Sequence, residues 1–166
     1  MVDKYTWVDI GSSYVPSEIS SAFLYGQLEL REVIAQRRKE IFLCYQEHFA
    51  HLEAEGLMRL PNVPLECQTN YHMFYLLLPD LETRANLIAH LKQQGILAVF
   101  HYVPLHTAPV GQQYGYREGD LPVTESLSER LVRLPFYYDL TEQDQMEVIG
   151  EIEKFLARSA RRRVAA

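Results

Sequence analysis

The chain has 166 residues, of which 48% are hydrophobic and 23% charged, a size and composition suited to one globular domain with a buried core. Its 22 acidic and 16 basic residues argue against a nucleic-acid partner, because phosphate binding needs a concentrated basic face. Without a membrane-length apolar run, a signal-peptide pattern or a CxxC pair, the sequence predicts a cytoplasmic protein with no membrane partner.

One long helix is the first predicted element. Ser17 follows Pro16 and can cap its N-terminus, and Gly56 can end it. Between them apolar residues recur at steps that are mostly three or four, the pattern of one buried helical face. The series is Ile19, Phe23, Gly26, Leu30, Val33, Ile34, Ile41, Tyr45, Phe49 and Leu52.

The length of this predicted helix suggests that something else packs against it. Residues 17–55 would span roughly 58 Å as a straight helix, whereas a domain of this size is only about 40 Å across. Either the helix kinks, around the polar residues 36–39, or it packs against a partner that this chain does not contain. A helical hairpin is a further alternative, although the heptad pattern is not sustained. We favour the missing partner.

Three strands and three more helices are predicted after residue 56. The strands are 72–78, 96–103 and 134–137; the helices are 81–94, 126–132 and 141–157; and residues 107–123 form a loop. In the helix 81–94 the residues expected to face inward are Leu81, Ala85, Leu87, Ile88 and Leu91. This order predicts an α/β (α+β) fold, with a sheet of about three strands and helices on one face.

The segment His101-Tyr102-Val103-Pro104-Leu105-His106 is the strongest candidate for a binding site, because it ends a predicted strand and begins a long loop. If the strand continues, His101 and Tyr102 point to opposite faces. His106 on the loop could donate to a phosphate or sugar oxygen, or move a proton near neutral pH. The alternative is a histidine bonded to the backbone. A metal site is not expected, since no third ligand lies nearby.

Two further features bear on cofactor chemistry. Gly11, Ser12 and Ser13 precede the long helix and could hold an anion at its N-terminus, although a plain capping turn explains them too. The four lysines are Lys4, Lys39, Lys92 and Lys154. None has the apolar setting that a Schiff-base lysine needs, so we expect no catalytic residue in this chain.

Several of these segments together resemble the DegT/DnrJ/EryC1/StrS sugar aminotransferases. They are residues 11–14 (GSSY), 16–22 (PSEISSA), 27–29 (QLE), 102–106 (YVPLH) with Pro109 and Tyr114, and 131–135 (LVRLP). The resemblance covers nearly the whole chain. It implies the small C-terminal domain of a fold-type-I transferase that depends on pyridoxal phosphate, with residues 1–15 as an interdomain segment at the active site, 16–160 as the domain and 161–166 as a tail.

The resemblance also implies roles for individual residues. Ser13 stands where many relatives have an asparagine that reaches the cofactor phosphate of the partner subunit. Tyr102 and His106 match the motif on the sugar-nucleotide side of the site, and His101 matches a closer subgroup. The cofactor lysine belongs to a large domain that this sequence lacks, so no cofactor is expected to bind this chain alone.

The complete enzyme would transfer an amino group from glutamate to a 4-keto-6-deoxy dTDP-sugar during surface polysaccharide synthesis. Its expected partners are the missing large domain or a second subunit, in a homo-oligomer. We expect the chain alone to be inactive. The alternative is a non-catalytic oligomerisation or regulatory module, because a long helix with an unpaired apolar face tends to find a partner.

Overall fold

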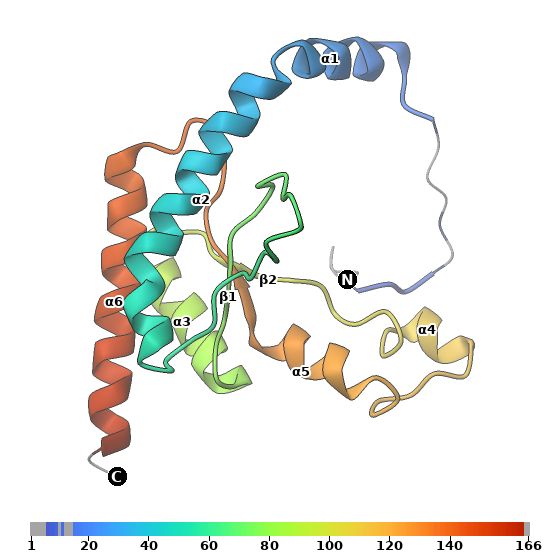
Figure 1. Ribbon diagram of the computed structural model, residues 1–166. Coiled ribbons are helices and arrows are strands. Elements are labelled where there is room, and N and C mark those ends of the chain that lie inside the picture. Colours follow the sequence, from blue (N-terminus) through green and yellow to red (C-terminus); the bar gives the residue numbers. More distant parts are fainter. Residues whose placement is uncertain (1–5, 10, 12–14, 165–166) are drawn as a thin grey trace.

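The computed structural model describes residues 6–9, 11 and 15–164, and this part of the chain forms helices around a small sheet (Figure 1). The elements in order are α1 (Glu18–Glu29), α2 (Arg31–Ala54), β1 (Tyr75–Leu77), α3 (Leu81–Gln93), β2 (Val99–Phe100), α4 (Pro109–Gln113), α5 (Pro122–Arg130), β3 (Leu131–Arg133) and α6 (Glu142–Val164). The predicted fold class is confirmed: a three-stranded antiparallel sheet combined with helices.

The sheet has the strand order β1-β3-β2, so β3 is the central strand. Leu76 pairs with Val132, and Phe100 pairs with Val132 from the other side, which puts these three residues on one face. Leu76 and Val132 are completely buried in the core. The opposite face carries Tyr75, Arg133 and Val99, which are only half-buried.

The core lies between the sheet and the helices α2, α3 and α6. Phe74 is fully buried, and its ring lies 5.0 Å from that of Phe42 and 5.1 Å from that of Tyr45. The hydroxyl of Tyr45 donates to the carbonyl of Pro135 at 3.0 Å. Gln145 is buried as well, and its side chain donates to the carbonyl of Ile41 at 2.8 Å, which joins α6 to α2. These aromatic contacts place the second half of the predicted long helix firmly in the fold.

The prediction of one continuous helix is wrong, because the helix is interrupted at Leu30 and forms α1 and α2. The N–H of Leu30 bonds to the carbonyl of Gln27 at 3.2 Å, a tight turn that lets α1 bend away from α2 (Figure 1). The break lies six residues before the polar segment 36–39, which the sequence indicates as the place for a kink. None of the residues of α1 is buried, so no packing within the described chain fixes its direction.

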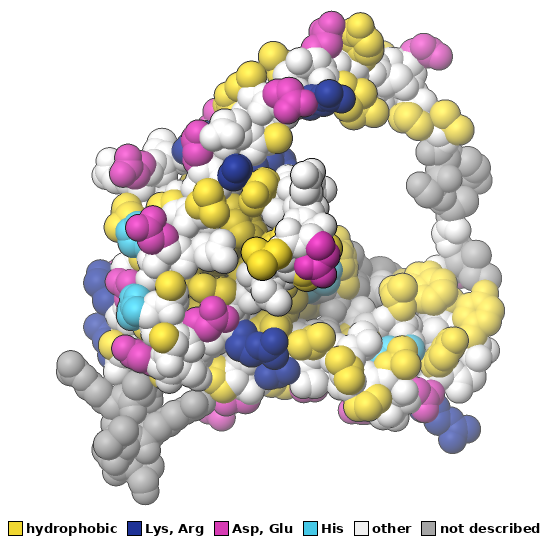
Figure 2. Space-filling view, in the orientation of Figure 1, with side chains coloured by type: hydrophobic (Ala, Val, Ile, Leu, Met, Phe, Trp, Pro, Cys, Tyr) yellow, Lys and Arg dark blue, Asp and Glu magenta, His cyan; other side chains and the backbone are white. Residues whose placement is uncertain are grey.

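The apolar series of the predicted helix is therefore divided. Its last four members, Ile41, Tyr45, Phe49 and Leu52, are buried. Its first part stays in solvent: Ile19 is 84% exposed and Phe23 is 73% exposed. Figure 2 shows hydrophobic side chains along α1 at the top of the molecule.

The termini of three helices follow the predictions closely. Ser17 caps α1 by accepting the N–H of Ser20 at 3.2 Å, and Thr141 accepts the N–H of Asp144 at 3.1 Å at the start of α6. Gly56 has a φ of 71° after α2, where a side chain would be strained. α6 runs on to Val164, beyond the predicted end at 157.

Other boundaries differ from the predictions. The third strand is Leu131–Arg133 instead of 134–137, because Pro135 cannot donate to a ladder. α5 starts earlier, at Pro122, and α4 forms inside the predicted loop. In α3, Leu87 and Leu91 are buried as predicted, but Leu81 and Ala85 are exposed.

Candidate functional site

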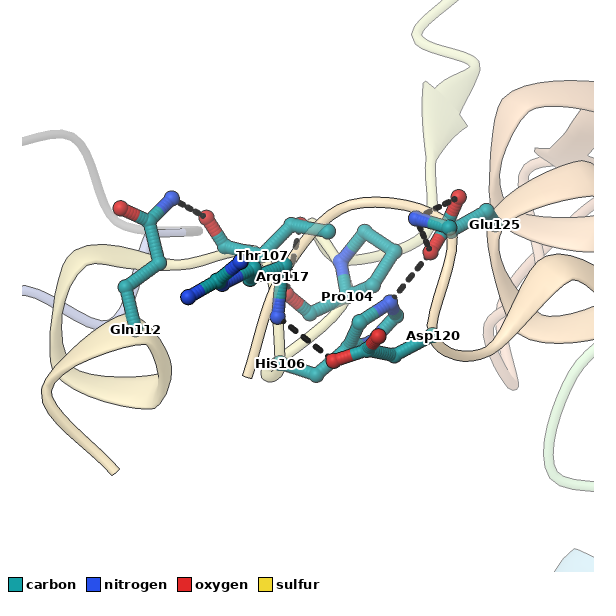
Figure 3. Close-up of polar contacts among 8 residues, drawn as sticks. Pro104, His106, Thr107, Gln112, Arg117, Asp120 and Glu125 are labelled. Carbon is teal, nitrogen blue, oxygen red and sulfur yellow. Dashed lines mark hydrogen bonds and ion pairs between the residues drawn. The ribbon is translucent and has the colours of Figure 1, made fainter. Parts of the chain in front are cut away.

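The loop after β2 is ordered by short-range hydrogen bonds around Thr107. Its hydroxyl donates to the carbonyl of Pro104 at 3.0 Å, and the side chain of Gln112 donates to the carbonyl of Thr107 at 2.8 Å (Figure 3). Pro109 occupies the first turn of α4, where its missing N–H costs nothing. The loop is therefore a fixed surface rather than a free chain.

His106 lies at the centre of this loop and is almost completely buried. Its Nε2 lies 2.6 Å from Oε1 of Glu125, a residue of α5 (Figure 3). Both oxygens of Glu125 also accept the N–H of Gly119, at 2.9 and 3.1 Å. The hydrogen bond with His106, followed by that with Gly119, holds the pKa of Glu125 below its ordinary value.

An aromatic cavity of about 500 Å³ opens beside His106. Its wall includes Trp7, Tyr114 and Tyr116. The rings of Trp7 and Tyr114 are nearly parallel, with an interplanar angle of 16° and 6.3 Å between their centroids. The carbonyl of Trp7 accepts the N–H of Val110 at 3.3 Å, so the N-terminal segment is tied to α4. Hydrophobic side chains gather over α4 in Figure 2.

His101 and Tyr102 lie just after β2, so the condition for their pointing to opposite faces, a strand that continues through them, is not met. β2 ends at Phe100, before these two residues, so the strand alternation does not reach them. Their rings are 4.9 Å apart in an edge-to-face contact. The guanidinium carbon of Arg133 lies 5.6 Å from the centroid of the Tyr102 ring. The structure thus joins His101 and Tyr102 to an arginine that the sequence did not single out.

Burial lowers the pKa of His101, and the positive charges of Arg133 and His72 lower it further. Both effects disfavour the protonated form of His101. Nδ1 of His101 and Nε of Arg133 are both buried without a hydrogen-bond partner among the described residues. Nδ1 of His72 forms a hydrogen bond with Oδ1 of Asn70, at 2.6 Å.

Ser13, the residue predicted to contact the cofactor phosphate, lies outside the described residues, as does Lys4. Lys39 and Lys92 are exposed, and Lys154 is paired with Glu151 at 2.7 Å on the surface. The described lysines therefore do not fit a Schiff base, which needs a desolvated amine.

Within the part of the chain that the structure describes, no three residues among His, Cys, Asp and Glu come together as ligands for a metal ion. None of the described helices has the length and apolar character of a membrane span.

The fold and its loop define a domain of the aminotransferase kind. The crystal structure of DesV from S. venezuelae, in complex with a ketimine intermediate, superposes with a TM-score of 0.76 over 93% of this chain, at 26% identity. A sequence profile of the DegT/DnrJ/EryC1/StrS aminotransferase family matches residues 1–153. The chain therefore belongs to the DegT/DnrJ/EryC1/StrS aminotransferase family, as the resemblance indicated.

Similar proteins are much longer than this chain. An uncharacterized protein, MJ1066, from Methanocaldococcus jannaschii is 31% identical over 92% of this chain, which corresponds to 40% of MJ1066. The spore coat polysaccharide biosynthesis protein SpsC of Bacillus subtilis is 29% identical over 81% of this chain and 35% of its own length. This chain also covers 40% of DesV.

Sequence reasoning missed three residues of this site: Glu125, Trp7 and Arg133. Glu125 and His106 are 19 positions apart, and no periodicity connects a loop to the helix that follows it. Trp7 is the only tryptophan of the chain, and its rarity was the one available signal. Arg133 was hidden because its strand was placed three residues too late.

Proposed function

We propose that this chain supplies the nucleotide-sugar side of the active site of a sugar aminotransferase, as the C-terminal portion of a longer enzyme. The observation that carries this proposal is the cavity formed where Trp7 meets the loop after β2, beside His106 of the family motif. Aromatic side chains in the wall of a cavity offer faces on which a planar base can stack, and such stacking is a common way to bind nucleotides. Residues 6–9 would then line the active site, in line with the assignment of 1–15 as an interdomain segment.

In this proposal the described residues bind and orient the substrate. The family's cofactor, pyridoxal phosphate, supplies the electron sink for amino transfer when it is bound. The lysine that binds this cofactor would lie in the portion of the longer relatives that this chain does not span. Ser13 would contact the cofactor phosphate of a partner subunit in a homo-oligomer, and Tyr102, His101 and His106 would lie on the sugar-nucleotide side.

We further propose a 4-keto-6-deoxy dTDP-sugar as the substrate and glutamate as the amino donor. The segments 3–7, 72–75 and 98–102 resemble the dTDP-4-amino-4,6-dideoxygalactose transaminase of enterobacterial common antigen synthesis. That reaction belongs to lipopolysaccharide and surface polysaccharide biosynthesis in the cytoplasm. The name of SpsC, a spore coat polysaccharide biosynthesis protein, supports a role in polysaccharide synthesis.

Calorimetric titration of the chain with dTDP, and separately with UDP and GDP, tests this function. We expect saturable binding of dTDP that is at least tenfold tighter than binding of GDP, and loss of that binding in Tyr114→Ala, whose ring faces Trp7. Tyr138→Ala, a change of an exposed tyrosine outside the cavity, is the matched control. A chain that binds no nucleotide would contradict the proposal.

The exposed face of α1 favours a second function, a non-catalytic oligomerisation or regulatory module. Phe23, Leu24, Tyr25 and Leu28 are each more than half exposed on this helix. An apolar surface of this kind tends to be covered by another protein surface. Concentration-dependent association without any nucleotide binding would favour this second function.

A further inference from the structure

Arg133 occupies a position where a positive charge is unexpected. It lies on the central strand of the sheet, in register with Tyr75 on one side and Val99 on the other. A half-buried arginine is normally paired with a carboxylate, because burial of an unpaired charge is unfavourable. Arg133 makes no ion pair within the described chain, and its Nε is buried without a hydrogen-bond acceptor.

The groups around Arg133 add positive charge and donors instead of neutralising it. His101 lies close enough to Arg133 and to His72 for both to lower its pKa, and no carboxylate acts on it in the opposite direction. Nδ1 of His101 is also buried without a partner among the described residues. The ring of Tyr102 contacts both groups, with its centroid 4.9 Å from that of the His101 ring and 5.6 Å from the guanidinium carbon of Arg133.

Arg133 and His101 thus lie around one tyrosine ring, with His72 near enough to lower the pKa of His101, in a chain whose net charge is −6. Two costs oppose folding here, because buried donors have no acceptor and the positive charge of Arg133 disfavours a protonated His101. An oxyanion removes both costs at once. It accepts from the arginine and the histidine, and its charge favours the protonated imidazole.

We propose that Arg133 and His101, with His72 beside them, form a binding site for a phosphate oxyanion, which in the proposed function is the diphosphate of the nucleotide sugar. This assignment rests on the proposed function only for the identity of the ligand. The guanidinium donates two parallel N–H groups to phosphate oxygens, and Nδ1 of His101 donates a third. Tyr102 holds the two basic groups in place through its ring.

The experiment uses the whole chain and inorganic pyrophosphate as the probe. Histidine ring signals are followed by two-dimensional NMR during titration with pyrophosphate near pH 7, and the pKa of His101 is measured with and without the anion. We expect saturable shifts of the His101 signal and a higher pKa of His101 when pyrophosphate is bound. Absence of a saturable shift in the unmodified chain overturns the proposal, and this measurement does not depend on the folding of any variant.

A pair of arginine variants tests whether Arg133 itself binds the anion. Arg133→Gln should weaken pyrophosphate binding about tenfold or more, the effect of losing one charge-assisted contact. Arg130→Gln is the matched control, because Arg130 bonds to the carbonyl of Ser126 within α5 and should bind pyrophosphate as the unmodified chain does. Equal weakening in both variants would mean a diffuse effect of charge and would overturn the site. Glutamate is titrated in parallel, and a site that takes glutamate but not pyrophosphate overturns the phosphate assignment.

A failure of the oxyanion site can be distinguished from a failure of the proposed function. If dTDP binds the unmodified chain and Arg133→Gln equally well, the nucleotide function stands and this site is wrong. If pyrophosphate binds through Arg133 but the chain shows no preference among dTDP, UDP and GDP, the oxyanion site stands and the substrate assignment is wrong.

Discussion

Nε2 of His106 and Oε1 of Glu125 lie 2.6 Å apart and connect the loop after β2 to the first turns of α5. His106 belongs to the segment 102–106 that resembles the family motif, whereas no sequence pattern indicates a role for Glu125. Because Glu125 also accepts the N–H of Gly119, one carboxylate orders both ends of the segment that carries α4. The cavity beside Trp7 therefore depends on a charge that lies outside its wall.

Glu125→Gln should loosen this segment without unfolding the core. The amide keeps one acceptor oxygen and has an NH2 group in place of the other, so either the bond with His106 or the double contact with Gly119 is weakened. We expect faster proteolytic cleavage within residues 107–121 and a red-shifted emission of Trp7 as the cavity opens to water. Glu118→Gln, which removes an exposed carboxylate from the same loop, should leave both measurements unchanged.

The lowered pKa of His101 predicts a loss of stability in mild acid. The unfolded chain takes up a proton on this histidine more readily than the folded chain, so the stability that neutral His101 contributes falls as the pH decreases through its ordinary value of 6.5. Urea denaturation at about pH 7.5 and about pH 5.5 should show a lower midpoint in acid. In His101→Gln that difference should shrink, whereas in His51→Gln, which changes an exposed histidine, it should persist.

Gly111 is required by close packing of α4 against the loop. A Cβ built at this position would overlap the carbonyl oxygen of Leu105 and lie 2.9 Å from Cα of His106, both backbone atoms that cannot move aside. We expect Gly111→Ala to lower the free energy of unfolding by about 1–3 kcal/mol. The same substitution in α6, Gly150→Ala, meets no atom within 4 Å and should raise it by about 0.5–1 kcal/mol. Equal effects of the two changes would contradict the packing described here.

The two halves of the predicted long helix should respond differently to the loss of an aromatic ring. Phe49 is fully buried, so Phe49→Ala should cost about 3–5 kcal/mol in chemical denaturation. Phe23 is 73% exposed, so Phe23→Ala should leave the free energy of unfolding nearly unchanged. If α1 is an interface, Phe23→Ala should instead weaken self-association in sedimentation experiments. A large loss of stability in Phe23→Ala would show that α1 packs within the chain.

The sequence predicted those parts of the fold that local patterns determine. The caps at Ser17 and Thr141 and the turn at Gly56 depend on a few neighbouring residues, and they were placed correctly. The buried face of α2 was visible because its apolar spacing matches the helical period. The same spacing continues through Leu30 and Val33, so periodicity could not reveal that the helix breaks there.

Only part of the candidate site could be predicted, because its contacts join residues that are far apart in the sequence. Tyr102 and His101 were found as residue types at the end of a strand, but their ring contact depends on where β2 ends. Arg133 meets them through strand pairing, and Glu125 meets His106 through the packing of α5. Contacts of this range carry no local sequence pattern, which is why the charges of the site were missed while its histidines were not.

The fluorescence of Trp7 during titration with dTDP is the most direct test, since this is the only tryptophan in the chain. We predict quenching that saturates at one equivalent of nucleotide. Thymidine should also produce this quenching at higher concentration, and Tyr114→Ala should abolish it. Fluorescence that stays constant while calorimetry detects bound dTDP would place the nucleotide elsewhere. If dTDP produces no quenching and calorimetry detects no bound nucleotide, the result contradicts the central claim that this chain forms the nucleotide-sugar side of an aminotransferase site.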